Sequence, residues 1–471
     1  MNIRELYKIY KRCGGVVATD TRTLKGGELF FALKGENFDG NEYALTALEA
    51  GAAFAVVSED SAVARSGALE DSALLTDDGL CRIIPVADTL KTLQELARWH
   101  RSVTFVDGKP LNVIALTGTN GKTTTKELVK SVLSVKYNVC ATEGNLNNNI
   151  GVPLTLLKIN GETQIAVVEM GASHPGDIKE LVEIALPDFG LITNVGKAHL
   201  LGFGSFEGVM KTKGELYDYL RRTADKVFIN ADNPYLCKMA SDRNLQSDPE
   251  RPYSLLVPYG VGYQNVRILP SSAEHPYLRM IIPVDDGGEV EVNTHLAGAY
   301  NADNVMAAFA VGQYFGVSAG DAAAAISAYV PSNNRSQMTK TDRNLLIVDA
   351  YNANPTSMEA AISNFASVES GSKVALLGDM LELGADSLKE HMAVIERVLP
   401  LGFSQVCLVG SEFSKAVSTM AGNGTAFSES LKTFADSGEL AAYLRAEPVS
   451  GCVVLVKGSR GIRMEKTLDV L

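Results

Sequence analysis

Short apolar runs alternate with segments of helical periodicity from residue 112 onward. The runs "NVIALT", "YNVCAT", "QIAVVEM", "FGLITNV" and "DKVFIN" predict strands, and the segments 122–135, 176–185 and 206–220 predict helices between them. Such alternation is typical of βαβ units, whose strands form a mostly parallel sheet. We therefore expect a doubly wound α/β domain over residues 106–316.

A polar stretch at residues 241–274 interrupts this alternation. The β-like segments "YLRMIIPV" and "EVEVNTHL" follow it, and then a helix that we expect to begin at Tyr300. We interpret the two segments as an antiparallel extension of the same sheet.

Two further domains complete the predicted architecture. Strands at "NLLIVDA", "KVALLG", "FSQVCLVG" and "GCVVLVKG", with helices at 356–365, 387–399, 412–420 and 430–445, predict a doubly wound, Rossmann-like domain over 317–471. Residues 1–105 form a third, mixed α/β unit with strand candidates "ELFFAL" and "AFAVVS". A chain of 471 residues is long enough for three domains.

The composition excludes several classes of protein. A hydrophobic content of 46% is that of a globular protein, and the apolar runs are too short to span a bilayer, so we expect no membrane insertion. The N-terminus lacks the pattern of a secretory signal, which favours a cytoplasmic location. The six cysteines form no C-x-x-C pair, which argues against disulfides and zinc. A net charge of −12 argues against nucleic-acid binding.

The segment "LTGTNGKTTTKE" at residues 116–127 has the setting of a phosphate-binding loop, a glycine turn between a strand and a helix. In such a turn, backbone N–H groups bind phosphate oxygens, Lys122 supplies a cation and Thr123 offers a hydroxyl to Mg²⁺. Gly118 nevertheless stands only three positions before Gly121, whereas the common pattern requires five. An incidental turn and a working loop of another lineage both remain open at this point.

Other candidate residues are ambiguous when they are considered alone. Glu169 ends an apolar strand, where a carboxylate can hold Mg²⁺ or cap the following turn. His199 follows another strand, and Lys213 lies on an amphipathic helix where a lysine is ordinarily a solvated charge. The asparagine-rich run "TEGNLNNNIGVPLTLL" fits a turn as well as a binding loop.

The shortened loop T-G-T-N-G-K-T-T-T resembles the ATP loop of the Mur ligase family, which adds amino acids or dipeptides to a nucleotide-linked cell-wall precursor and includes relatives of folylpolyglutamate synthase. The resemblance implies a three-domain architecture with a P-loop ATPase-like central domain, and ATP with two Mg²⁺ ions as ligands. In this family the second lysine of a segment like "KTKGELY" carries a carbamate derived from CO₂, which implies that role for Lys213. The implied catalytic residues are Lys122, Glu169, His199 and Lys213, and the implied metal ligands are Thr123, Glu169, His199 and the Lys213 carbamate.

The resemblance also implies two sets of binding residues. The expected ATP contacts are Thr117, Gly118, Thr119, Asn120, Gly121, Lys122, Thr123, Thr124, Asn301 near the adenine, Arg335 facing the phosphates, and Asp349, Tyr351 and Asn352. The expected contacts of the nucleotide-sugar substrate are Thr21, Arg22, Asn145, Asn147, Asn148 and His174. Helix capping is an alternative role for Asn301.

The ends of the chain resemble one branch of the family. The segments "TDTRTLKGGELFFALKGENFDG", "VDAYNANPTSMEAAI" and "VLVKGSRGIRMEKTL" are similar to ligases that join D-alanyl-D-alanine to UDP-N-acetylmuramoyl-tripeptide (UDP-MurNAc-tripeptide). That reaction implies attack of the tripeptide carboxylate on ATP, an acyl phosphate, and displacement of phosphate by the dipeptide amine. The alternatives are a ligase that adds a single amino acid and, in a different class, an ATP-driven binding module. We expect a monomer.

Overall fold

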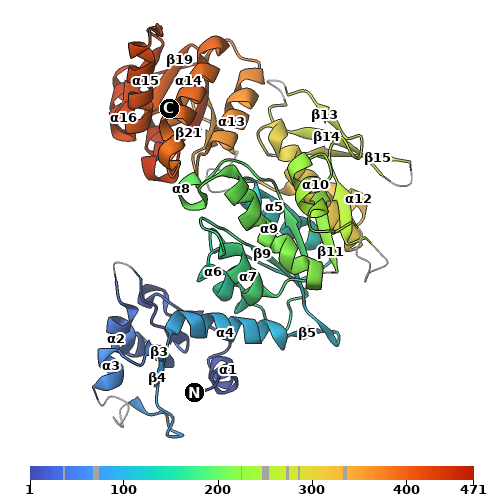
Figure 1. Cartoon of the computed structure of the whole chain (residues 1–471), viewed down its shortest axis with the longest axis vertical. Helices are drawn as coiled ribbons and strands as arrows, with labels where there is room; N and C mark the ends of the chain where they lie inside the picture. The colour runs from blue at the N-terminus through green and yellow to red at the C-terminus, as the bar shows by residue number, and fades with distance from the viewer. Residues whose placement is uncertain are drawn as a thin grey trace.

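The structure, a computed structural model, describes residues 1–35, 38–66, 74–223, 225–246, 254–271, 275–284, 287–331 and 337–471. Its α/β regions follow one another along the longest axis (Figure 1), with the N-terminus in the lower region and the C-terminus in the upper one. Among the described residues, every helix is too short or too polar to cross a membrane. All six cysteines are free thiols.

The N-terminal region contains a four-stranded parallel sheet in the order β1-β2-β3-β4. The two strands that the sequence predicts here are confirmed. The strands are β1 (Val17–Ala18), β2 (Leu29–Phe31), β3 (Phe54–Ser58) and β4 (Ile83–Val86), and the helices are α1 (Ile3–Arg12), α2 (Ala44–Glu49), α3 (Ala62–Arg65) and α4 (Thr89–Ser102).

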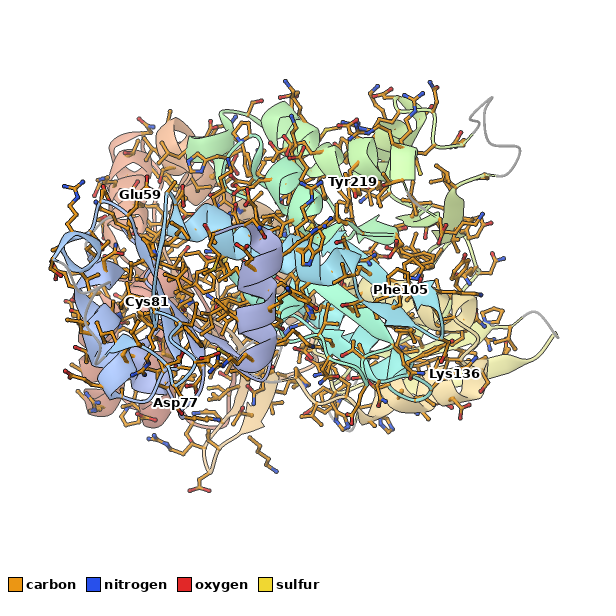
Figure 2. The ribbon with its side chains drawn as sticks, turned by 90° about the horizontal axis from the view of Figure 1, so that it is seen from below. Glu59, Asp77, Cys81, Phe105, Lys136 and Tyr219 are labelled. Atoms are coloured by element: carbon orange, nitrogen blue, oxygen red, sulfur yellow. The ribbon has the colours of Figure 1, made fainter. Side chains whose placement is uncertain are left out.

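Helices α1 and α4 attach this sheet to the middle of the chain. Their buried side chains share one hydrophobic cluster with residues 111–255, so a single core joins the two regions. The Tyr10 hydroxyl donates to the Leu157 carbonyl at 2.7 Å, and His100 Nε2 lies 2.8 Å from the Ile159 carbonyl. Strands β5 (Phe105–Val106) and β6 (Lys109–Pro110) form a short antiparallel ribbon. Seen from below (Figure 2), Phe105 of this ribbon lies apart from Glu59 and Cys81 of the N-terminal region.

The middle region is a six-stranded parallel sheet in the order β12-β11-β10-β7-β9-β8, which confirms the five strands predicted there. The strands are β7 (Asn112–Thr117), β8 (Val139–Ala141), β9 (Ile165–Glu169), β10 (Phe189–Ile192), β11 (Lys226–Asn230) and β12 (Leu256–Tyr259). The helices are α5 (Lys122–Leu133), α6 (Gly151–Leu156), α7 (Asp177–Ala185), α8 (Leu200–Phe203), α9 (Phe206–Thr223), α10 (Pro234–Ser241), α11 (Ala302–Tyr314) and α12 (Ala319–Ala328).

The expected antiparallel extension of this sheet is wrong. Strands β13 (Arg267–Leu269), β14 (Arg279–Pro283) and β15 (Glu289–Asn293) instead form a separate antiparallel sheet. Strand β12 pairs in parallel with β11 and occupies the edge that an extension would need. The separate sheet packs its buried side chains, such as Met280 and Val292, into the cluster that contains α11 and α12.

The C-terminal region is a six-stranded sheet in the order β16-β17-β21-β18-β19-β20, parallel except for the edge strand β16. The four predicted strands are present. The strands are β16 (Gln337–Lys340), β17 (Leu345–Asp349), β18 (Lys373–Gly378), β19 (Gln405–Val409), β20 (Leu431–Phe434) and β21 (Val453–Lys457), and the helices are α13 (Pro355–Ser367), α14 (Ser387–Val398), α15 (Ser411–Gly422) and α16 (Ser437–Ala446).

The predicted helix at 430–445 is wrong over its first part. Residues Leu431–Phe434 form β20, which pairs in parallel with β19. Helix α16 begins only at Ser437, because Asp436 accepts hydrogen bonds from the amides of Gly438 and Glu439 and so caps the helix there. The cap marks a boundary that apolar spacing alone does not reveal.

Candidate active site

A cavity of about 970 Å³ lies where the middle and C-terminal regions meet. Strands β7, β9, β10 and β17 deliver residues to it from their carboxyl ends, the edge at which α/β sheets commonly bind ligands. Many of the residues predicted from sequence line it together: Thr119, Asn120, Gly121, Lys122, Thr124, Asn145, Asn147, Asn148, Glu169, His174, His199, Asn301, Asp349, Tyr351 and Asn352.

The two glycines of the loop occupy positions where a side chain would collide with neighbouring atoms. Gly118 has φ +149°, and a Cβ there would lie 2.0 Å from the Thr193 hydroxyl oxygen. Gly121 has φ +77°, and its Cβ would lie 2.4 Å from Asn304 Oδ1. Both positions therefore require glycine, because neighbouring elements leave no room for a Cβ.

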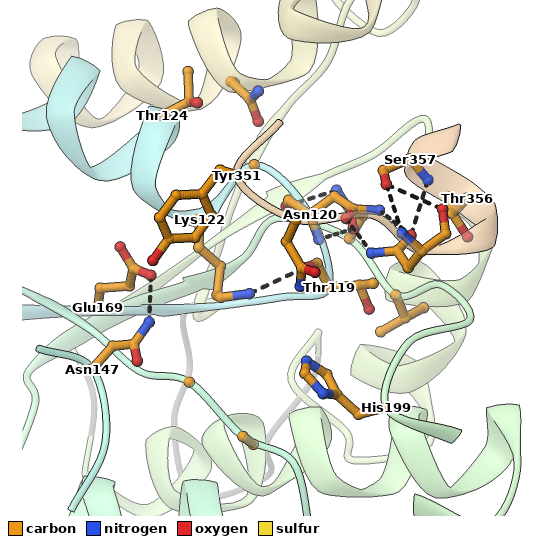
Figure 3. A pocket seen from close by; sticks show the side chains of 18 of the residues that line it. Thr119, Asn120, Lys122, Thr124, Asn147, Glu169, His199, Tyr351, Thr356 and Ser357 are labelled. Carbon is orange, nitrogen blue, oxygen red and sulfur yellow. Dashed lines mark hydrogen bonds between the residues drawn. The ribbon is translucent and has the colours of Figure 1, made fainter. Parts of the chain in front are cut away.

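Helix α5 begins directly after Gly121, and no side chain caps its first amide groups. An uncapped helix N-terminus is a natural anion site, because its N–H groups and dipole favour negative charge. Lys122 Nζ donates to the carbonyls of Gly118 at 2.8 Å and Thr119 at 3.0 Å, which holds the amine over the loop (Figure 3). The turn thus has the geometry and charge to bind phosphate.

Glu169, the last residue of β9, accepts hydrogen bonds from two polar side chains. Its Oε2 accepts a hydrogen bond from the Thr123 hydroxyl at 2.9 Å. Its Oε1 accepts one from Asn147 Nδ2 at 2.7 Å, as Figure 3 shows. A carboxylate beside a hydroxyl is a donor set suited to Mg²⁺. The part of the chain that the structure describes contains no cluster of three or more His, Cys, Asp or Glu side chains able to hold a metal. A hydroxyl and one carboxylate supply only part of the oxygen ligands of Mg²⁺, which commonly takes the rest from water and substrate phosphates.

Lys213 lies within electrostatic range of this carboxylate, and His199 lies within electrostatic range of Lys213 and Lys122. Lys213 is 3% exposed and does not line the cavity; burial, with the nearby Lys122 charge, holds its pKa well below its ordinary value. His199 lines the cavity at φ +50°, and its Nδ1 contacts the Glu382 carboxylate of the C-terminal region. Burial lowers the pKa of His199, against the opposing effect of Glu382.

Several predicted binding residues have internal partners. The Thr117 hydroxyl donates to the Met170 carbonyl at 2.7 Å, and Asn148 Oδ1 accepts from the Gly151 amide at 2.9 Å. Asn301 is 1% exposed; it donates to the Ala297 carbonyl at 2.8 Å and accepts from Asn304 Nδ2 at 3.0 Å. Part of each side chain is therefore committed to supporting the cavity wall.

Seven predicted site residues are not among the residues that line the cavity: Thr117, Gly118 and Thr123 of the turn, Lys213, Thr21, Arg22 and Arg335. Thr21 and Arg22 lie in the N-terminal region, where Arg22 forms an exposed ion pair with Asp20 at 2.6 Å. Arg335 lies outside the described residues.

The structure adds Asn304, which sequence reasoning missed, and places Lys457 on the cavity wall, where the sequence left either a surface charge or a substrate contact open. Asn304 accepts from the Thr125 hydroxyl at 3.0 Å and lies under Gly121; its spacing of one helical turn from Asn301 is a signal that could have found it. Lys457 is 1% exposed, lines the cavity and pairs with Asp349 at 2.5 Å. The opposite end is lined by Asn230, Asp232, Asn233, Tyr235 and Asp303.

Family models match the chain in three successive parts. The Mur ligase family catalytic domain matches residues 16–101, the Mur ligase middle domain matches 116–312, and the Mur ligase glutamate ligase domain matches 334–460. The UDP-N-acetylmuramoyl-tripeptide--D-alanyl-D-alanine ligase of Bacillus subtilis is 34% identical over 97% of this chain and 92% of its own length.

Solved structures agree with these matches. Crystal structure I of MurF from Acinetobacter baumannii has a TM-score of 0.79 and 28% identity, covering 98% of this chain and 97% of its own. The MurF ligase of Thermotoga maritima in complex with ADP has a TM-score of 0.77 and 26% identity, covering 97% and 96%. The chain belongs to the Mur ligase family.

Proposed function

We propose that the chain is an ATP-dependent ligase that joins D-alanyl-D-alanine to UDP-MurNAc-tripeptide and releases ADP and phosphate. The near full-length similarity to a Bacillus subtilis ligase named for that reaction is the observation that carries this proposal. The cavity supports it, because it combines a phosphate-binding turn with acidic and amide groups from both flanking regions. A volume of about 970 Å³ is at the upper end for ligand sites, as several substrates require.

The ATP phosphates bind at the turn between β7 and α5 in this proposal. The uncapped amides of α5 hold phosphoryl oxygens, and Lys122 leaves its two carbonyl partners to neutralise the charge that develops on the transferred group. The adenosine then extends toward Asn301 and the residues around Asn230. The ADP bound to the Thermotoga maritima relative supports a nucleotide in this family's fold.

Two Mg²⁺ ions are part of the proposal, and when bound they supply positive charge beside the phosphoryl group. Thr123 and Glu169 are the proposed ligands of the first ion, and His199 and a carbamate on Lys213 those of the second. The carbamate forms when a neutral amine adds to CO₂ and releases a proton. Burial of Lys213 beside the Lys122 charge supports this, because both lower the pKa of the ammonium group against the opposing effect of nearby carboxylates and so favour the neutral amine.

The ligation itself needs no nucleophile from the protein. The tripeptide carboxylate takes the γ-phosphoryl group, and the dipeptide amine then displaces phosphate from the acyl phosphate. The asparagine loop carrying Asn145 and Asn147 lies on the cavity wall with His174 and can orient the tripeptide end. Asp349, Tyr351 and Asn352 face the same space from the C-terminal region. The chain's contribution is therefore alignment of the reactants, neutralisation of charge and exclusion of water.

The proposal also covers the domain bounds, the oligomeric state, the location and the N-terminal substrate contacts. We place the domains at residues 1–105, 106–316 and 317–471, we expect a monomer, and the need for ATP supports a cytoplasmic location. Thr21 and Arg22 of the N-terminal region are proposed to bind the uridine diphosphate part of the substrate.

A substrate panel tests the proposed reaction. Purified protein is mixed with ATP, Mg²⁺ and UDP-MurNAc-tripeptide, and then with D-alanyl-D-alanine or with single amino acids. Phosphate release and a pentapeptide product that require the dipeptide are expected. Release with single amino acids alone would instead identify a ligase of the other type, and release independent of any acceptor would identify an ATP-driven binding module.

A further inference from the structure

Asn120 of the phosphate turn and Asn354 of the C-terminal region form a reciprocal amide pair. Asn354 Nδ2 donates to Asn120 Oδ1 at 2.7 Å, and Asn120 Nδ2 lies 3.4 Å from Asn354 Oδ1. Figure 3 shows Asn120 linked by these bonds toward the segment of Thr356 and Ser357. The pair joins residues 234 positions apart.

The main chain of Asn120 is held separately, by the end of β10. Its amide donates to Asn194 Oδ1 at 3.0 Å, and its carbonyl accepts from the Thr193 hydroxyl at 2.6 Å and from Asn194 Nδ2 at 3.1 Å. The backbone of the turn is thus fixed within the middle region, whereas the side chain of Asn120 is available to the C-terminal region. Asn120 therefore connects the turn to the C-terminal region.

Asn354 is itself held rigidly. It caps α13 by accepting from the Ser357 amide at 2.9 Å, while its own amide donates to the Ser357 hydroxyl at 3.0 Å. The preceding carbonyl, of Ala353, accepts from the Ser459 hydroxyl at 3.2 Å. Hydrogen bonds hold the backbone at Ala353 and Asn354 in place, so the Asn354 side chain keeps a fixed position relative to the C-terminal sheet.

Close packing surrounds the pair. A Cβ on Gly196 would lie 2.7 Å from the Thr356 hydroxyl oxygen, so the start of α13 presses against the loop after β10. Lys197 and Glu390 form an ion pair across the same boundary at 2.6 Å. Of these three contacts, the amide pair is the one that involves a residue of the phosphate turn, Asn120.

We infer that Asn354 is a positioning residue of the ligation reaction, which holds the phosphate turn through Asn120 when the C-terminal region is docked. This inference rests on the proposed function and deepens it. It explains how a residue of the C-terminal region affects ATP binding without contacting ATP. Asn354 sets the side-chain rotamer of Asn120 and so favours the turn geometry that receives phosphate. Docking of the C-terminal region and completion of the ATP site are therefore coupled through the Asn120–Asn354 pair.

Asn354→Ser in the full-length chain separates this role from helix capping. Serine caps helices as well as asparagine, yet it is too short and has too few polar atoms to form the amide pair. Asn2 provides a matched control, because it caps α1 with the same type of capping box and is far from the cavity. The kcat/KM for ATP is measured for wild type, Asn2→Ser, Asn354→Ser, Asn120→Ser and the double variant Asn120→Ser/Asn354→Ser.

We expect Asn354→Ser to lower kcat/KM for ATP roughly tenfold, with an unchanged KM for UDP-MurNAc-tripeptide and an unchanged melting temperature. The double variant should lose little more than Asn120→Ser alone, because the two residues act through one interaction. Wild-type kcat/KM in Asn354→Ser would overturn the inference, as would losses that multiply in the double variant or that accompany a lower melting temperature. If the wild-type protein makes no pentapeptide, the proposed function fails by itself, and the same cycle is measured on the affinity for ADP.

Discussion

The Thr123 hydroxyl donates a hydrogen bond to the Glu169 carboxylate at 2.9 Å, and so joins the first turn of α5 to the end of β9. Both residues are buried, at 8% and 1% exposure, yet Glu169 lines the cavity. A carboxylate held by a hydroxyl and by the amide of Asn147 has a fixed direction before any ligand arrives. This preorganisation explains how two residues 46 positions apart can serve one cation.

Replacing Glu169 with Gln tests this pair. The amide keeps the shape of the side chain but removes its charge, so the apparent affinity for Mg²⁺ should fall and kcat should drop by about 100- to 1,000-fold at fixed Mg²⁺. The measurement is a titration of ligase activity against Mg²⁺ concentration. Glu143→Gln is the control, because Glu143 forms an exposed ion pair with Lys158 and does not line the cavity. An unchanged Mg²⁺ dependence in Glu169→Gln would exclude Glu169 as a ligand.

Gly121→Ala should abolish ATP use through a collision with Asn304. The added Cβ would lie 2.4 Å from Asn304 Oδ1, and the residue would also be strained at φ +77°. Gly424→Ala separates the two effects, because Gly424 has φ +89° but no neighbour within 4 Å of a Cβ. We expect about 1 kcal/mol of destabilisation and normal activity for Gly424→Ala, against at least a 100-fold loss of kcat/KM for ATP in Gly121→Ala. Equal behaviour of the two variants would show that Asn304 does not support the turn.

The proposed carbamate makes activity depend on CO₂. Wild-type activity should fall in CO₂-depleted buffer and recover on addition of bicarbonate, and ¹³C-labelled bicarbonate should give a carbamate signal that Lys213→Ala lacks. Lys211→Ala is the control, since Lys211 lies on the same helix and is exposed. Full wild-type activity without CO₂, with no labelled signal, would leave Lys213 as an unmodified buried amine.

His100 should make stability depend on pH. Burial lowers its pKa from the ordinary value, and its Nε2–H donates to the Ile159 carbonyl in the neutral ring. Because the unfolded chain takes up a proton near pH 6.5 and the folded chain does so only at lower pH, the contribution of His100 is complete above pH 6.5. It is lost as pH falls below that value, by at most about 1.4 kcal/mol per pH unit.

The comparison of wild type with His100→Gln isolates this effect from other titrating groups. The melting temperature of the wild type should exceed that of the variant at pH 7.5, and the difference should shrink at pH 5.5. A difference that is constant between these pH values would mean that His100 has the same pKa in the folded and the unfolded chain.

The strands and the phosphate turn were predictable because their signals are local. Apolar runs separated by helical periodicity specify the strands of the middle and C-terminal sheets, and a glycine turn between a strand and a helix specifies the loop. The helix boundary before α16 was not predictable in this way, since it depends on the cap at Asp436 and on pairing of β20 with β19.

Contacts between distant segments explain what sequence reasoning missed. Asn354 follows a strand in a different domain from Asn120, and nothing in the spacing of either residue indicates their pairing. The same holds for Gly118, because the sequence does not indicate its close packing against Thr193. Sequence patterns place a residue at a sheet edge, but the opposite wall of the cavity comes from another part of the chain.

The most direct test of the account is pentapeptide synthesis by Lys122→Ala, with Lys130→Ala as the control on the exposed side of the same helix. Lys122 supplies the cation at the phosphate turn, so its loss should lower kcat by at least 100-fold while Lys130→Ala keeps wild-type activity. Wild-type rates of pentapeptide formation in Lys122→Ala would contradict the assignment of this turn as the ATP site.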